Sequence, residues 1–250
     1  MIGYDGTEKK EMIDAVHAKW SVKSADLPNG SDWEGMTEMS EIHRIKCGNG
    51  NCYIVENGTE GILVDTGKKE FADQVIKACM PYRIRLIVLT HGHFDHAENA
   101  AQIADTLGVP IAMEEKDCDL IGSNARQSLF AATLPGKIVL AASLKEFDRR
   151  TMQVFKPDVL LHDGDSLADY GIDAQIIALP GHTRGSIGID VEEKYLLVGD
   201  ALMNMFYPTV SMLYHNRSDM LESAEKISSM GDRIIYFGHG KPVANRRWIK

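Results

Sequence analysis

The sequence is poor in cysteine, and its first 20 residues contain no uninterrupted hydrophobic segment. Its four cysteines show no C-x-x-C spacing, which argues against a disulfide-rich secreted scaffold and favours free thiols over a bridge or a cysteine metal site. Residues 1–20 mix lysine and glutamate with scattered apolar residues, a pattern unlike a signal peptide or a membrane span. We therefore expect a cytoplasmic protein with no membrane association.

Positive charge is also scarce. The chain has 27 Lys and Arg against 36 Asp and Glu, a net charge of -9, so its surface as a whole would repel nucleic acid and anionic membranes. We expect a small-molecule substrate as the partner, and a homo-oligomer remains open. The hydrophobic content of 44% over 250 residues is that of an ordinary globular protein, which allows one domain with a large core.

The beginning of the chain has an irregular pattern with a Pro28-Asn29-Gly30 turn signal, so we interpret residues 1–36 as an N-terminal arm and residues 37–250 as a single domain. Apolar runs and alternation predict strands, and apolar side chains at helical spacing predict helices. The expected strands are residues 42–47, 52–56, 61–64, 84–89, 110–113, 159–161, 172–179, 186–191, 195–198 and 233–237, and the expected helices are residues 71–80, 96–107 and 218–230.

One segment between these strands has a helical pattern instead of a strand pattern. Residues 114–156 carry amphipathic helical patterns, which we expect to be broken at Pro135-Gly136, and they indicate a helical insertion. A segment of this kind often covers a functional site, but it equally adds to core packing. The strands from residue 159 to residue 198 are interpreted as a second set, separate from those before the insertion.

One short stretch concentrates potential metal ligands. His91, His93, Asp95 and His96 lie within six consecutive residues, directly after the apolar run 84–89. Each side chain offers a lone pair to a divalent cation, and a buried strand would hold the loop rigidly. This stretch predicts a metal site and favours a metal-dependent hydrolase.

Three further candidates stand at the ends of expected strands and next to glycine: His182 in Pro180-Gly181-His182, Asp200 in Gly199-Asp200, and His239 in Gly238-His239-Gly240. Glycine allows a sharp turn and a close approach of the backbone to a bound ion. A single such residue is more often a turn or core residue. Because the arrangement recurs at four strand ends, we interpret these residues as parts of one site.

These motifs resemble those of the metallo-β-lactamase superfamily. The HxHxDH motif is matched by His91 to His96, and the resemblance extends from about residue 42 to residue 243, with Asp65, His182, Asp200 and His239 in family order. It implies an α/β fold of α+β type, a four-layer αβ/βα sandwich. In this fold, two mixed β-sheets pack face to face, helices cover the outer faces, and the metals lie in a cleft at one edge.

The resemblance also implies how the ligands divide between two metals: His91, His93 and His182 hold one, Asp95, His96 and His239 the other, and Asp200 bridges them. Imidazoles and carboxylates suit two Zn²⁺ ions, with Fe or Mn as alternatives. Two such ions share a hydroxide that attacks the substrate, and Asp95 and Asp200 are the candidate catalytic residues, with Asp95 as a proton acceptor.

Other residues are expected around the ligands. By the same resemblance, Asp65 orients a ligand histidine, although it could simply close the Asp65-Thr66-Gly67 turn, and Thr183 or Ser186 help similarly. Related enzymes often build the substrate pocket between the bridging aspartate and the next helix. Tyr207, Tyr214 and His215 lie there in the sequence, with core packing as the alternative role.

The expected reaction is hydrolysis of a small ester, thioester or lactone by a hydroxide that bridges two metals. The alternatives are an iron-dependent oxidoreductase resembling persulfide dioxygenases, phosphodiesterase or β-lactamase activity on the same metal centre, and a metal-stabilised binding protein without catalysis. Two residues depart from the family pattern: Glu98 stands where glycine is frequent, and Arg184 where proline is common.

Overall fold

The computed structural model describes residues 39–147 and 149–249, so the predicted arm of residues 1–36 lies outside the described part. The domain begins with the expected meander of three antiparallel strands, β1 (Glu41–Cys47), β2 (Gly50–Glu56) and β3 (Glu60–Val64). The turn between β1 and β2 is shorter than predicted, because Cys47 already pairs with Gly50. This hairpin brings the turn at Asn49 towards the predicted metal ligands.

The first sheet continues with three parallel strands, β4 (Arg83–Val88), β5 (Ile111–Met113) and β6 (Val159–Leu160), in the order β1-β2-β3-β4-β5-β6. The prediction that residues 159–161 belong with the later strands is wrong. The chain returns from the insertion and aligns β6 in parallel with β5, where Asp158 exchanges hydrogen bonds with Ile111. The insertion therefore connects two neighbouring strands of the same sheet.

The second sheet has the order β13-β12-β9-β8-β7 and is also mixed, since only β12 and β9 run parallel. Its strands are β7 (Ala174–Ala178), β8 (Ile187–Val191), β9 (Tyr195–Leu197), β12 (Ile234–Tyr236) and β13 (Val243–Ala244). A separate hairpin is formed by β10 (Leu202–Met203) and β11 (Thr209–Val210). Two-residue strands such as these leave no readable pattern in the sequence.

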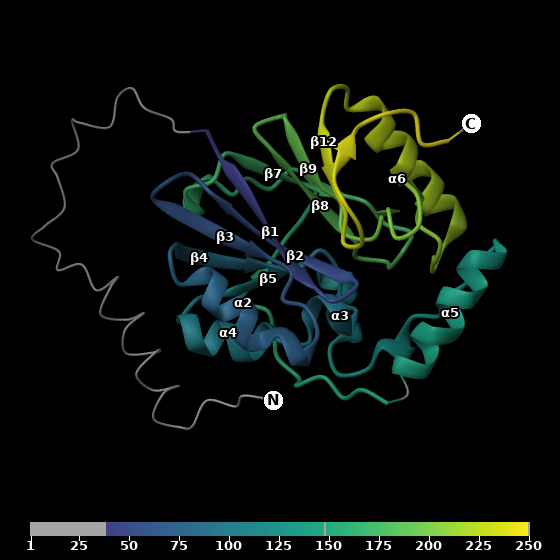
Figure 1. The fold of residues 1–250 in the computed structure, drawn as a ribbon, viewed down its shortest axis with the longest axis horizontal. Helices are drawn as coiled ribbons and strands as arrows, with labels where there is room; N and C mark the ends of the chain where they lie inside the picture. Colours follow the sequence, from purple (N-terminus) through teal and green to yellow (C-terminus); the bar gives the residue numbers. More distant parts are fainter. Residues whose placement is uncertain (1–38, 148, 250) are drawn as a thin grey trace, which may run out of the picture.

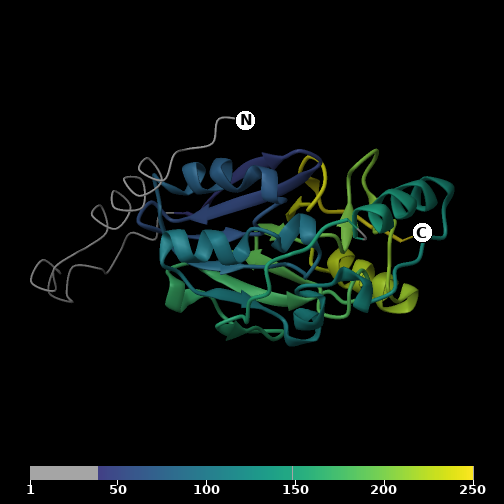
Figure 2. The same cartoon turned by 90° about the horizontal axis from the view of Figure 1, so that it is seen from below.

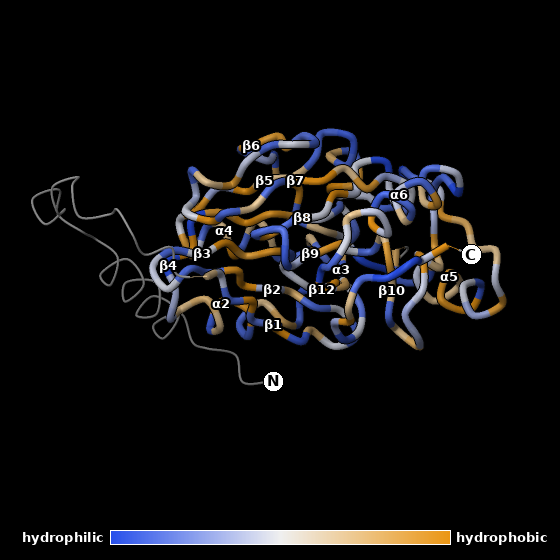
Figure 3. The backbone as a smooth tube through the Cα atoms, turned by 90° about the horizontal axis from the view of Figure 1, so that it is seen from above, coloured by the Kyte–Doolittle hydropathy of each residue, from blue (hydrophilic) through white to orange (hydrophobic). Residues whose placement is uncertain are grey.

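Alternating side chains divide the core into layers. Ile62 and Val64 of β3 pack between the two sheets, whereas Leu63 packs against the outer helices α2 (Ala72–Cys79) and α4 (Ala100–Leu107). On the far side, the second sheet packs against α6 (Arg217–Ser229). Burial of each large aliphatic side chain stabilises the fold by about 1.5–3 kcal/mol. The four-layer sandwich of two mixed sheets with outer helices is confirmed (Figures 1 and 2), and apolar strands run through its interior (Figure 3).

The helix expected over residues 96–107 is in fact two helices, α3 (Phe94–Ala97) and α4. The helix is interrupted at Asn99. The Nδ2 of this residue donates hydrogen bonds to the carbonyl oxygens of Thr66, Gly67 and Lys68. This amide thereby ties the ligand loop to the turn after β3. The end of α4 is as expected, because Gly108 closes it in the left-handed conformation with φ 68°.

The described part of the insertion, residues 114–147 and 149–156, contains two short 3₁₀ helices, η2 (Glu115–Leu120) and η3 (Asn124–Arg126), and one α-helix, α5 (Leu134–Phe147). Two further 3₁₀ turns, η1 (Lys69–Phe71) and η4 (Ala168–Tyr170), lie elsewhere. The predicted break at Pro135-Gly136 coincides with the start of α5 at Leu134, since residues 127–133 before it are not helical. Both residues lie in the first turn of α5, where proline is tolerated because its missing N–H would have no helical partner. This helix lies at the rim of the domain (Figure 1), where half of its residues are exposed and the ring of its last residue, Phe147, lies 5.3 Å from that of His93.

Across residues 39–147 and 149–249, the structure contains no helix with both the length and the apolar character that crossing a membrane requires.

Candidate metal centre

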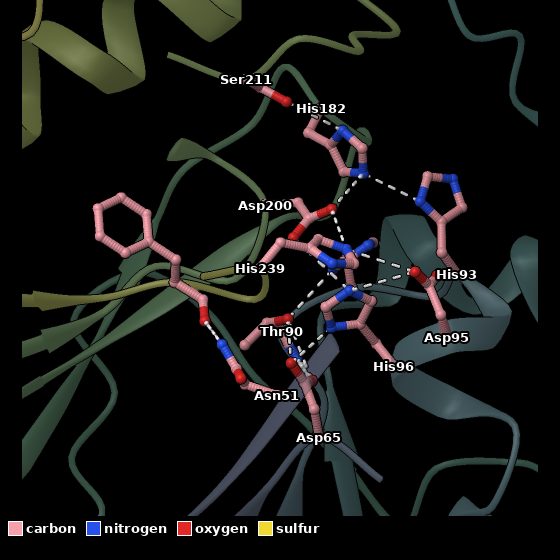
Figure 4. A network of polar contacts seen from close by, with 12 residues as sticks. Asn51, Asp65, Thr90, His93, Asp95, His96, His182, Asp200, Ser211 and His239 are labelled. Carbon is pink, nitrogen blue, oxygen red and sulfur yellow. Dashed lines mark hydrogen bonds and ion pairs between the residues drawn. The ribbon is translucent and has the colours of Figure 1, made fainter. Parts of the chain in front are cut away.

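The predicted ligands converge at one edge of the sandwich, where five strands end. The carboxyl ends of β3, β4, β7, β9 and β12 lead, in that order, to Asp65, His91, His182, Asp200 and His239. Figure 4 shows Asp65, His182, Asp200 and His239 gathered around one centre. The site leaves no room for a side chain at Gly238. A β-carbon added there would collide with Asp200 and lie 2.6 Å from Cε1 of His96. Glycine is therefore required at this position by the close approach of two candidate ligands.

Three histidines form the first group. The rings of His91, His93 and His182 have centroids 4.8 Å apart in every pair, with interplanar angles of 85–87°. Nδ1 of His93 lies 3.0 Å from Nε2 of His182, and all three side chains are buried. Mutually perpendicular imidazoles whose nitrogens gather within 4.8 Å of one another can bind a single cation from three sides.

A second group lies beside the first and consists of Asp95, His96 and His239, again with ligand atoms within 4.8 Å of one another. Asp200 lies between the two groups. Its Oδ2 is 3.3 Å from Nε2 of His239 and 3.7 Å from Nε2 of His182, which belong to different groups. One carboxylate thus faces both sets of ligands.

Asp65 fixes the orientation of one of these rings. Its Oδ2 lies 2.7 Å from Nδ1 of His96, and its Oδ1 accepts a hydrogen bond of 2.8 Å from the backbone N–H of Thr90. The carboxylate makes Nδ1 the protonated nitrogen, so Nε2 of His96 turns to the centre of the site. Asp65 also occupies the left-handed region, with φ 60°. It therefore both shapes the turn and contacts a predicted ligand, the two roles that the sequence left open.

Backbone carbonyl groups orient two other rings. Nδ1 of His182 donates to the carbonyl oxygen of Leu213 at 2.9 Å, and Nδ1 of His239 donates to that of Asn49 at 2.9 Å. Since a carbonyl group only accepts, both rings carry the proton on Nδ1 and present the Nε2 lone pair to the site. Sequence reasoning missed these partners, because a backbone carbonyl is available at every residue and leaves no signal.

Several buried atoms at the centre have no hydrogen-bond partner among the described residues: Nε2 of His91, His93 and His96, and Oδ1 of Asp200. An unpaired buried polar group costs about 1–3 kcal/mol, so such a cluster requires an explanation. Cations bound between nitrogen and carboxylate ligands would satisfy these atoms. The donor set therefore fits divalent metal ions, and the site as a whole is built to bind them.

The carboxylates and imidazoles also shift one another's protonation. Burial would raise the pKa of Asp200, but the neighbouring His239 and His96 rings lower it well below its usual range. Burial likewise opposes a charge on His96, yet Asp65, Asp200 and Asp95 raise its pKa to about 9. The carboxylates thus strongly favour positive charge at this ring, and protons compete there with a metal cation.

Thr183 and Ser186 are placed differently from the expectation. Their hydroxyl groups lie 2.6 Å apart, and Oγ1 of Thr183 donates to Oδ2 of Asp117 at 2.6 Å. The ring of His182 is held instead by Leu213 and by Ser211, whose Oγ is 3.3 Å from Nδ1. Thr183 and Ser186 therefore stabilise the loop that carries the ligand rather than the imidazole itself.

The predicted pocket residues lie on two segments. Tyr207 is 52% exposed on the loop between β10 and β11. The backbone of Tyr214 pairs with Phe130, and Nδ1 of His215 contacts the carbonyl oxygen of Ser128 at 3.0 Å. His215 also donates its backbone N–H to the carbonyl oxygen of His182, so this segment is attached directly to a predicted ligand loop.

The two departures from the family pattern bind the insertion to the site. Oε2 of Glu98 accepts from the backbone N–H of Lys69 at 2.8 Å and from Arg150 at 2.7 Å. Arg184 forms an ion pair with Asp119, which lies on η2. Both residues thus anchor the insertion to loops next to the predicted ligands.

The family follows from this combination of fold and ligands. The model of the metallo-beta-lactamase superfamily matches residues 45–239, which span the ligand loop and the last predicted ligand. The chain belongs to this superfamily. The match confirms the family that the sequence motifs indicated. Members of this superfamily are metallo-hydrolases.

The individual relatives share little sequence identity with this chain. Hydroxyacylglutathione hydrolase GloC of Haemophilus influenzae is 26% identical over 197 residues, which cover 76% of this chain and 85% of the relative. The crystal structure of BLEG-1 B3 metallo-beta-lactamase has a TM-score of 0.64 at 24% identity and covers 82% of this chain and 94% of its own. The structure of TTHA1623 in a di-iron-bound form has a TM-score of 0.58 at 19% identity, with 84% and 100% covered. These structural matches show a shared fold.

Proposed function

We propose that the protein is a metal-dependent hydrolase that uses two divalent cations to cleave a small ester, thioester or lactone. The observation that carries the proposal is the position of Asp200, whose carboxylate lies 3.3 Å from His239 of one ligand group and 3.7 Å from His182 of the other. A structural metal site is normally closed by four protein ligands around one ion. Two incomplete groups that share one carboxylate favour a catalytic centre.

In this proposal the ligands divide as the family resemblance implies. His91, His93 and His182 would hold one cation, Asp95, His96 and His239 would hold the other, and Asp200, whose carboxylate faces both groups, would serve both. Zinc is the proposed metal, since neutral imidazoles and carboxylates suit it. The bound cations would supply Lewis-acid activation of water at neutral pH and of the substrate carbonyl group.

The chain itself supplies orientation and proton transfer. Asp65, Leu213 and Asn49 fix three imidazoles so that their Nε2 atoms face the centre. We assign Asp95 as the acceptor of the proton released when water attacks. Burial opposes its charge, but His96 and His239 lower its pKa, so the carboxylate is ionised at neutral pH and has a free oxygen lone pair for the proton.

Support for the substrate class comes from the relatives. GloC is named as a hydrolase of hydroxyacylglutathione, an acylated thiol, and most of its length aligns with this chain. We propose that Tyr207, Tyr214 and His215 line the substrate side of the centre, because the backbone of His215 is bonded to the loop of His182. The small-molecule partner, the cytoplasmic location and any homo-oligomer remain predictions.

An iron-dependent oxidoreductase resembling persulfide dioxygenases is the second candidate. TTHA1623, which shares the fold, has been crystallised in a di-iron-bound form, and nitrogen and carboxylate ligands suit iron as well as zinc. Metal analysis of the protein as isolated, together with oxygen uptake in the presence of a persulfide, separates this candidate from a hydrolase.

The decisive test is a substrate screen on protein of measured metal content. Lactones, thioesters, phosphodiesters and β-lactams are offered to the two-metal form and to chelator-treated protein. We expect turnover of a lactone, thioester or ester by the two-metal form alone. Preferential turnover of a phosphodiester or β-lactam would contradict the proposed substrate class, and a two-metal protein that turns over none of the substrates would contradict the proposed hydrolase.

A further inference from the structure

Asp117 is a buried carboxylate that the site described so far does not use. It lies on η2, in the insertion, and its side chain is fully buried although its neighbours Glu115 and Lys116 are exposed. In the sequence it is one of several acidic residues in a segment expected to be helical. Nothing in that pattern distinguishes it from its solvated neighbours.

The carboxylate of Asp117 accepts hydrogen bonds from two loops that each carry predicted ligands. Its Oδ2 accepts from the backbone N–H of Gly92 at 3.0 Å and from Oγ1 of Thr183 at 2.6 Å. Its Oδ1 accepts from the backbone N–H of Gly185 at 2.7 Å and from Gln127 at 3.2 Å. Gly92 lies between His91 and His93, while Thr183 directly follows His182 and Gly185 lies three residues after it.

The backbone of η2 also lies very close to the backbone of both loops. A β-carbon at Gly92 would lie 2.7 Å from Cβ of Leu120 and 2.8 Å from the backbone oxygen of Asp117. A β-carbon at Gly185 would lie 2.8 Å from the backbone nitrogen of Asp117. The backbone of η2 thus packs directly against both loops, and the carboxylate joins them at the point of contact.

A neighbouring amide completes the connection. Oδ1 of Asn124 accepts from the backbone N–H of Phe94 at 2.8 Å, and its Nδ2 donates to the carbonyl oxygen of Gly92 at 2.9 Å. Gln127 Oε1 accepts from the backbone N–H of Arg184. Buried side chains of the insertion therefore satisfy backbone groups on either side of the histidines, which is how ligand loops are kept in register.

We propose that Asp117 is a positioning residue for the first cation: it joins the loop of His91 and His93 to the loop of His182 so that the three imidazoles converge. The inference rests on the proposed two-metal function. Charge is important for this role, because a carboxylate accepts from all four donors at once. An amide of the same shape has one accepting oxygen, so its NH₂ group would face a backbone N–H of Gly92 or Gly185 and push one loop away.

The test is calorimetric titration of the metal-free full chain with Zn²⁺. Asp117→Asn keeps the volume of the side chain, and Glu115→Gln is the matched control, since it removes one negative charge from the same 3₁₀ helix at an exposed position. His182→Ala and His239→Ala identify which binding event belongs to which ligand group. For Asp117→Asn we expect about 10–100-fold weaker binding of the first cation, little change at the second, and wild-type behaviour in the control.

Thr183→Val and Thr183→Ser provide a second test that does not depend on the folding of Asp117→Asn. The valine variant removes one donor to Asp117 and should weaken the first cation several-fold, whereas the serine variant retains the hydroxyl group and should restore its binding. Equal zinc affinity of the first site in the wild type, Asp117→Asn and Thr183→Val would overturn the role of Asp117. Equal weakening of both cations would also overturn it, since this would indicate a general structural effect.

The two proposals fail in distinguishable ways. A wild-type chain that binds two cations but hydrolyses nothing in the screen contradicts the proposed function and leaves the titrations of Asp117 valid. A wild-type chain that binds no cation contradicts both. Unchanged affinities in the variants contradict the positioning role alone.

Discussion

The carboxylate of Asp65 lies 2.7 Å from Nδ1 of His96, a residue 31 positions further along the chain, and both side chains are buried. The pair joins the end of β3 to the ligand loop after β4. Because the carboxylate accepts the proton of Nδ1, it determines which nitrogen of His96 remains free to bind a metal.

Replacement of Asp65 by asparagine should therefore weaken metal binding without unfolding the chain. Asparagine tolerates the left-handed backbone, with φ 60°, that this position adopts. We expect about 10–100-fold lower affinity for the second cation and a comparable loss of activity. Zinc titration and kinetics measure both quantities. Wild-type affinity in this variant would show that Asp65 serves only the turn.

Asp200→Ala should lower hydrolysis and metal content together, because its carboxylate faces both ligand groups. We expect a loss of activity of about 100-fold or more, beyond that of an orienting residue. Metal analysis and turnover of the best substrate from the screen are the measurements. Asp105→Ala is a suitable control, since Asp105 is exposed on α4, outside the site. Full activity of Asp200→Ala with two metals retained would exclude a bridging role.

Gly238→Ala should damage the centre although it removes no ligand. Its β-carbon would collide with Asp200 and lie 2.6 Å from Cε1 of His96, so one of these side chains must move. The matched control is Gly50→Ala, whose β-carbon would lie 3.9 Å from Cε1 of His239, at an ordinary contact distance. We expect loss of at least one bound metal in the first variant alone, measured after dialysis. Two metals retained in Gly238→Ala would show that the site has more room than its geometry indicates.

The ion pair between Glu70 and Arg150, which ties the end of the insertion to η1, should make stability depend on pH. The hydrogen bond from Arg150 lowers the pKa of Glu70, so the folded chain favours the ionised form. Stability from this pair is present above the unfolded pKa of about 4.3 and is lost as the pH falls through the folded pKa.

Glu70→Gln should accordingly be less stable than the wild type at pH 7 by less than about 1 kcal/mol, since Glu70 is half exposed. The difference should shrink below about pH 4. Thermal unfolding of both proteins between pH 7 and pH 4 measures it. A difference in stability that does not change with pH would indicate lost packing rather than a lost charge.

Much of the fold was predictable because its signals are local. The first three strands and α2 follow from apolar alternation and helical spacing, and Gly108 ends α4 as glycine does at many helix ends. The split between α3 and α4 was not predictable. It depends on Asn99 donating to carbonyl groups more than 30 residues away, and no pattern within the helix records that contact.

The sequence by itself determined which side chains could bind metal. The four ligands of the His91 loop and the three that follow later strands were recognisable, since imidazoles and carboxylates beside glycine at strand ends carry a chemical signature. Only the tertiary structure decided how these side chains are held. Asp117, the carbonyl groups of Leu213 and Asn49, and the pairing of β6 with β5 all depend on segments that meet after folding. An acidic residue in a polar segment looks the same whether it is solvated or buried between two loops, and only its burial and partners reveal the difference.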